Sequence, residues 1–180
     1  MLRFAPRVLP RFQSRDLAAL IDLYEANYLR LMHLVPDLDG FEQRTVVSRV
    51  SGALDLYLTV HERFKYTTSI SLTYRFDGDH SVMLEPFARI CVYHDVRAVE
   101  VVSHCRRRRI YAPRRRGDQR ERMPEINRRW ELNRFLLKWL RFCTHQGHIF
   151  LTATARPDDD AHAMILDYQS ALRIDLSIDK

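Results

Sequence analysis

The sequence is poor in glycine, proline and cysteine, and each shortage argues against a class of protein. Its 180 residues include five Gly and seven Pro, too few for a collagen-like or linker-type chain. Cys91, Cys105 and Cys143 are an odd number without a CxxC pair, which argues against a disulfide framework or a zinc site. No apolar run approaches the roughly 18–20 residues of a membrane span. We therefore expect a cytoplasmic protein with no membrane partner, metal or cofactor.

What is present is enough for one folded domain. Hydrophobic residues make up 46% of the chain and aromatic residues 11%, which excludes wholesale disorder. We expect a flexible leader at residues 1–13, a single domain at 14–156 and a C-terminal extension at 157–180. The leader lacks the apolar core of a secretory signal. The two ends should be the most mobile parts, unless Met164, Ile165 and Tyr168 of the extension dock on the domain.

The positive charge is concentrated in one segment. Arg outnumbers Lys by 26 to 3, as in proteins from a genome rich in G and C, and the formal net charge is +6. The stretch from Arg106 to Arg122 contains nine arginines and only two acidic residues, a net charge of +7. The net charge of all other residues is therefore −1. Arg is also the side chain that binds phosphate and carboxylate most specifically, because its donors form a planar fork. We call residues 106–122 the Arg-rich segment.

Hydrophobic periodicity predicts the fold class. Apolar residues recur at helical spacing over 17–31, with Ser14 as a candidate N-cap, and again over 132–143. Between them, apolar and polar residues alternate over 54–60, 66–76, 90–92 and 99–101, and more weakly over 45–50. The order predicts an α+β domain: one antiparallel sheet of about five strands, with N- and C-terminal helices packed on its apolar face.

One hairpin has a predicted register. An even-length turn over 94–97 sets Val92 opposite Val99 and Ile90 opposite Val101, all on the core face. Cys91 then lies opposite Glu100 on the other face. A slip by one residue would expose the four aliphatic side chains, so packing favours this register.

Four sequence blocks, in order, carry a family resemblance. They are Glu25-x-Asn27-Tyr28-x-x-Leu31-x-x-Leu34-x-Pro36, Glu62-x-x-Lys65-Tyr66-Thr67-Thr68, Val92-Tyr93-His94-Asp95 with Glu100-Val101, and Leu132-Asn133-x-Phe135-Leu136-x-x-Trp139-Leu140-x-Phe142-Cys143. This set resembles the YqiB-like proteins (DUF1249), a proteobacterial family of unknown function, over residues 16–147. The resemblance implies a bacterial cytoplasmic protein and no particular reaction. The residues after Gly147 extend beyond the family's usual end.

The Arg-rich segment is the first candidate site. Several arginines that reach phosphates would release counterions, and an aromatic ring among them could stack on a base. Alternatively, the segment is a solvated loop or pairs with an acidic partner protein. The candidate binding residues are Arg106, Arg107, Arg108, Arg109, Tyr111, Arg114, Arg115 and Arg116.

A second candidate site lies at two predicted turns. A histidine beside a carboxylate can act as a general base, and a Lys–Glu pair with hydroxyls could hold a phosphate. The other interpretation is two ordinary hairpin turns, with His94 and Glu100 on opposite faces. The candidate residues are Glu62, Lys65, Tyr66, Tyr93, His94, Asp95 and Glu100. Asn27 and Asn133, near apolar helix faces, are expected to be buried amides.

Three functional hypotheses follow. The sequence has no GxxxxGK[ST], GxGxxG or HExxH motif, so nucleotide hydrolysis, dinucleotide chemistry and zinc proteolysis lack their usual support. The leading hypothesis is a binding protein for nucleic acid or another polyanion. The alternatives are an enzyme or sensor for a phosphorylated small molecule, and an adaptor in a protein assembly.

Overall fold

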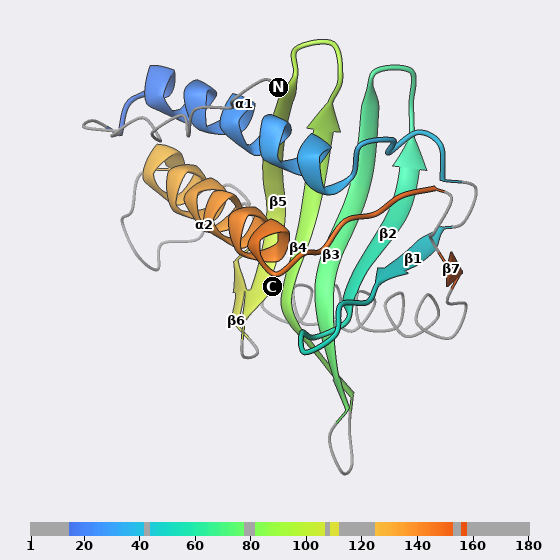
Figure 1. Cartoon of the computed structure of the whole chain (residues 1–180). Coiled ribbons are helices and arrows are strands. Elements are labelled where there is room, and N and C mark those ends of the chain that lie inside the picture. Colours follow the sequence, from blue (N-terminus) through green and yellow to red (C-terminus); the bar gives the residue numbers. More distant parts are fainter. Residues whose placement is uncertain are drawn as a thin grey trace, which may run out of the picture.

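The computed structural model describes residues 15–41, 44–77, 82–106, 109–111, 125–152 and 156–157, and in these residues one antiparallel sheet carries both α-helices on the same face (Figure 1). The helices are α1 (Leu17–Leu34) and α2 (Glu125–His145). The strands are β1 (Thr45–Ser48), β2 (Leu56–Arg63), β3 (Thr67–Asp77), β4 (Val82–Tyr93), β5 (Ala98–Arg106), β6 (Arg109–Tyr111) and β7 (Arg156–Pro157).

The sheet is a meander in which strands adjacent in sequence are also adjacent in space. The order is β6-β5-β4-β3-β2-β1-β7, so β7 alone among the described strands joins the sheet far from its sequence neighbour. The predicted α+β class is confirmed, with five main strands and two short edge strands. No helix in the described part of the chain is long and apolar enough to span a membrane.

The predicted hairpin register is confirmed. Val92 pairs with Val99, Ile90 with Val101, and Cys91 with Glu100. The four aliphatic residues are buried, at 0–5% exposure, because they face the helices. Period-2 alternation was therefore sufficient to fix this register.

The N-terminus of α1 differs from the expectation. Asp16 caps the helix, with its carboxylate accepting a 2.8 Å hydrogen bond from the Ala19 N–H, whereas Ser14 lies outside the described residues. Leu17 and Ile21, two of the apolar residues that recur at helical spacing over 17–31, are exposed. The buried stripe instead runs through Leu20, Leu23, Asn27, Leu31 and Leu34. It includes Asn27, whose side chain is hydrogen-bonded to α2, and a search for apolar residues alone omits this position.

Helix α2 contributes a buried tryptophan to the main core cluster. Trp139 is 5% exposed and meets the Tyr74 ring edge-on, with centroids 5.9 Å apart. It belongs to the same buried cluster as Leu56, Leu58, Ile70 and Leu72, which are the apolar side chains of β2 and β3. The predicted packing of this helix on the sheet is confirmed.

Two buried amides join both helices to the sheet. The Asn27 side-chain amide donates to the Asn133 backbone carbonyl at 3.2 Å and to its Oδ1 at 3.3 Å. The same Oδ1 accepts from the Val101 backbone N–H at 3.0 Å, and Asn133 Nδ2 donates to the Arg129 carbonyl at 2.8 Å. Both side chains are 0% exposed. One amide thus satisfies a strand N–H and fixes the distance between the helices.

A buried polar cluster lies where the chain leaves α2. The Ile149 N–H donates to Ser48 Oγ, and Ser48 Oγ lies 3.1 Å from His148 Nδ1. Either of these two atoms can be the donor, depending on the histidine tautomer. Burial lowers the pKa of His148 below its ordinary 6.5. Nearby, burial raises the pKa of Cys143 to about 11, so its thiol stays protonated next to the Tyr74 hydroxyl.

Replacing Trp139 should destabilise the protein strongly. Trp139→Ala removes a buried ring and leaves a cavity, which should cost about 3–5 kcal/mol of unfolding free energy. For a chain of this size the melting temperature should fall by about 6–20 °C in a thermal melt followed by circular dichroism. Phe64→Ala, at an exposed ring, is the control and should melt like the wild type. An unchanged melting temperature for Trp139→Ala would show that α2 does not pack on the sheet as described.

Stability should fall on acidification because of His148. The folded pKa is below the unfolded value of 6.5, so below pH 6.5 the unfolded state binds a proton that the folded state does not. The stabilisation is complete above that pH and is lost as the pH falls toward the folded pKa. His148→Asn keeps a side chain that can donate to or accept from Ser48 but cannot titrate, so its melting temperature should decline less between pH 7 and pH 5. His145→Asn, which removes an exposed histidine, should keep the steeper wild-type decline; equal slopes in all three would contradict this origin.

Candidate functional site

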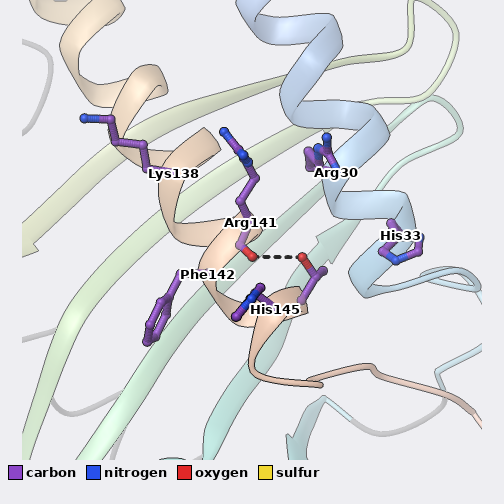
Figure 2. A pocket seen from close by; sticks show the side chains of 7 residues that line it. Arg30, His33, Lys138, Arg141, Phe142 and His145 are labelled. Carbon is purple, nitrogen blue, oxygen red and sulfur yellow. Dashed lines mark hydrogen bonds between the residues drawn. The ribbon is translucent and has the colours of Figure 1, made fainter. Parts of the chain in front are cut away.

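A positively charged groove lies between the C-terminal halves of the two helices. Arg15 forms a 2.7 Å ion pair with Glu131 near the helix N-termini, whereas Arg30 and Arg141 line the same groove near the C-termini, so the helices run in the same direction (Figure 1). The groove is shallow and open to solvent, with a volume of about 590 Å³. It is lined by Arg30, His33, Lys138, Arg141, Phe142, Thr144 and His145, and Figure 2 shows those of α1 across from those of α2.

The sequence makes this end of the helix pair uniformly basic. Helix α1 has no acidic residue after Glu25, and α2 has none after Glu131. In the same stretch of α2, Arg134, Lys138, Arg141 and His145 follow one another at spacings of four, three and four, which places them on one helix face. Within the described part of the chain, none of Arg30, Lys138 and Arg141 pairs with a carboxylate.

The negative ends of the helix dipoles offset only part of this positive charge. Each helix C-terminus carries roughly half a negative elementary charge, so two parallel helices offer about one in total. The groove holds three permanent cations, Arg30, Lys138 and Arg141, besides its two histidines. About two positive charges are left without compensation. An anion in the groove would relieve this repulsion.

The remaining lining residues set the character of the groove. The Thr144 hydroxyl donates to the Leu140 and Arg141 carbonyls at 3.1 and 3.0 Å, so its proton is used within α2 (Figure 2). Phe142 is 52% exposed beside the cations. The described residues include no cluster of three or more metal-ligating side chains. The groove therefore combines fixed positive charge with one exposed aromatic ring.

The Arg-rich segment falls mostly outside the described residues. Arg107, Arg108, Arg114, Arg115 and Arg116 lie in the undescribed stretches, so the structure does not place them. The first part of the segment is a strand and not the solvated loop considered above. Strand β6 pairs with β5, with Arg106 opposite Arg109 and His104 opposite Tyr111. Backbone hydrogen bonds between β5 and β6 therefore order this part of the segment.

The second candidate site is only partly assembled. The two hairpin ends lie side by side, because the His94 N–H donates to the Tyr66 carbonyl at 2.9 Å. The His94 ring, however, is engaged by Thr68, with Nε2 2.9 Å from Oγ1. Lys65 lies over the Tyr66 ring at 4.8 Å, while Glu62 and Asp95 are exposed. His94 and the nearby turn residues thus adopt the arrangement of ordinary hairpin ends.

Glu100 belongs to a different polar group. It accepts from the Tyr93 hydroxyl at 3.3 Å and lies 3.6 Å from the Arg129 guanidinium. Burial first, and then the charge of Glu100, raise the pKa values of Tyr93 and Tyr24, so both phenols stay neutral. Glu100 thus links the sheet to α2 through Arg129 and also binds the Tyr93 hydroxyl. The His94 ring instead contacts Thr68.

Sequence reasoning missed the groove, although a signal was present. It concentrated on the densest run of arginines and treated α2 only as a buried helix. The acid-free stretch after Glu131 and the helical spacing of Lys138 and Arg141 could have shown a basic face. The contribution of Arg30 could not, because it depends on α1 lying parallel to α2.

Comparisons with known proteins give a family. A family model described as "Protein of unknown function (DUF1249)" matches residues 30–149. YqiB of Escherichia coli K12, described as an uncharacterized protein, is 28% identical over 133 residues, which are 73% of this chain and 91% of YqiB. The YqiB proteins of the O6:H1 and O157:H7 strains match to the same extent. No solved structure matches significantly. The groove residues, from Arg30 to His145, thus lie within the matched region, and the chain belongs to the DUF1249 family.

Proposed function

We propose that the protein binds nucleic acid, preferentially single-stranded, in the groove between the C-terminal halves of α1 and α2. The observation that carries the proposal is that three permanent cations, Arg30, Lys138 and Arg141, line one groove without carboxylate partners among the described residues. Cations held together in this way repel one another, and a chain of phosphates offsets that repulsion.

The exposed ring favours a single strand. Proteins that bind single strands combine a positive groove, which follows the backbone, with aromatic side chains on which bases stack. Phe142 is such a ring, exposed between Arg141 and the end of α2. Stacking contributes about 1–3 kcal/mol per base and needs no particular base, so we expect little sequence specificity.

The Arg-rich segment would strengthen the same interaction. Its net +7 raises the local concentration of any polyanion and speeds association, an effect that falls with salt. The segment joins α2 at Glu125, the N-terminus of the helix, whereas the groove lies at its C-terminal half, so the segment would act through long-range attraction. The proposal includes a cytoplasmic location, which the free thiols of Cys91 and Cys143 support.

Removing two groove cations should weaken binding and reduce its salt dependence. The double variant is Lys138→Ala with Arg141→Ala. The slope of log K against log salt is negative, and each lost phosphate contact should make it about 0.7 less steep. The total change should approach 1.4. Fluorescence anisotropy of a labelled oligothymidylate at several salt concentrations measures both quantities. The charge-matched control, Arg44→Ala with Arg97→Ala, removes two exposed cations outside the groove and should change the slope much less.

The outcomes separate the hypotheses. Equal effects of the groove and control pairs would mean that only net charge matters, and the groove assignment would fail. Absence of wild-type binding even at low salt would end the nucleic-acid proposal. If inorganic phosphate or a mononucleotide instead displaces the oligonucleotide at low concentration, a phosphorylated small molecule becomes the leading ligand.

The Arg-rich segment can be tested separately. Changing Arg114, Arg115 and Arg116 together to Ala should alter stability by no more than about 0.5 kcal/mol per residue if they are exposed. The same change should flatten the salt dependence by up to about 2 in slope for a single strand. A gel-shift titration at two salt concentrations and a thermal melt check the two expectations. Unfolding of this variant would instead make these arginines structural ion-pair partners.

A further inference from the structure

The sheet face that is turned away from both helices is buried over part of its area. Alternation along the strands places Val47, Tyr57, Thr73 and Phe87 on this face, and their exposures are 7%, 4%, 0% and 2%. Thr45, Thr59 and Ser71 share the face and are also buried. We call these seven residues the second-face patch. Toward the hairpin ends of the same face, Cys91 and Tyr93 are only half-buried, so the patch has a limited extent.

The described elements do not account for this burial. Helices α1 and α2 lie on the opposite face (Figure 1). The chain after α2 also runs on the helix side, because the Phe150 N–H donates to the Leu34 carbonyl and His148 contacts Ser48. None of these described segments therefore covers the second-face patch.

We propose that residues 158–180 cover the second-face patch of their own chain. Strand β7 pairs with β1 at Val46 and Val47, so the chain enters residue 158 at the patch itself. Two other long undescribed stretches start elsewhere. Residues 1–14 end at Arg15, which is bound to Glu131 on the helix side, and residues 112–124 connect β6 to α2 at the far edge of the sheet.

The sequence of the extension fits an apolar cover. Ala161, Met164, Ile165, Tyr168 and Leu172 follow one another at i, i+3, i+4, i+7 and i+11, the stripe of an amphipathic helix. The patch has a matching chemistry. Ser71 Oγ is buried with no hydrogen-bond partner in the described residues, as expected beneath an apolar rather than a polar surface.

The dimensions also agree. The patch crosses β1 to β4, which is three strand spacings or about 14 Å. A helix of twelve residues, from 161 to 172, is about 18 Å long. One short helix therefore covers the patch and leaves the hairpin ends of the face open, as the exposure of the face shows. Both the family match, which ends at residue 149, and the proposed nucleic-acid site are independent of this inference.

Hydrogen exchange on the full chain is the direct test. In the wild type, amides of residues 161–172 should exchange at least about tenfold more slowly than in the same sequence as a free peptide. Light scattering should give the mass of a monomer under the same conditions. Exchange at the rate of the free peptide would overturn the proposal without any variant.

A matched pair of substitutions tests the orientation of the stripe. Ile165→Asp places a charge in the apolar stripe, and Ser170→Asp places the same charge on the opposite side of the predicted helix. Ile165→Asp should abolish the protection of residues 161–172 and speed exchange around Tyr57 and Thr73, whereas Ser170→Asp should preserve both. Identical behaviour of the two variants would contradict the proposal. A dimeric mass, with protection lost on dilution to monomer, would also overturn it and make a second copy of the chain the occupant.

Discussion

The hydrogen bonds of Asn133 are the constraint on which the arrangement of the two helices depends. Its side-chain oxygen accepts from the Asn27 amide of α1 and from the Val101 N–H of β5, and its own amide is satisfied within α2. Each buried group without a partner would cost about 1–3 kcal/mol, so the helices cannot slide without breaking several bonds at once. Apolar packing alone would tolerate such a shift far better.

This registration is what produces the groove. With Asn27 held at Asn133, Arg30 is set beside the part of α2 that contains Lys138 and Arg141. Parallel helices then place both C-termini, each partly negative, at one end of the molecule. The basic side chains there stabilise those ends and still leave positive charge in excess. The same basic residues therefore stabilise the helix ends and line the groove that we propose as the nucleic-acid site.

The fold could be predicted further from the sequence than the site. Strand alternation fixed the pairing of Val92 with Val99, and the apolar spacing of α2 placed Trp139 in the core. The apolar pattern failed where a polar side chain is buried. In α1 the buried face includes Asn27, and Ile21 is therefore exposed. The groove was missed because it joins side chains from two helices whose relative direction no local pattern encodes.

The meander also has a consequence for how the chain is made. Strands β1 to β6 pair with their sequence neighbours, so the sheet can assemble as it emerges from the ribosome. Helix α1 emerges first, but its partner Asn133 follows Asn27 by 106 residues. At about 5–20 residues per second, the delay is roughly 5 to 20 seconds. During that interval Leu20, Leu23 and Leu31 have no completed core to enter, and the nascent helix is the segment of this protein that a chaperone would meet.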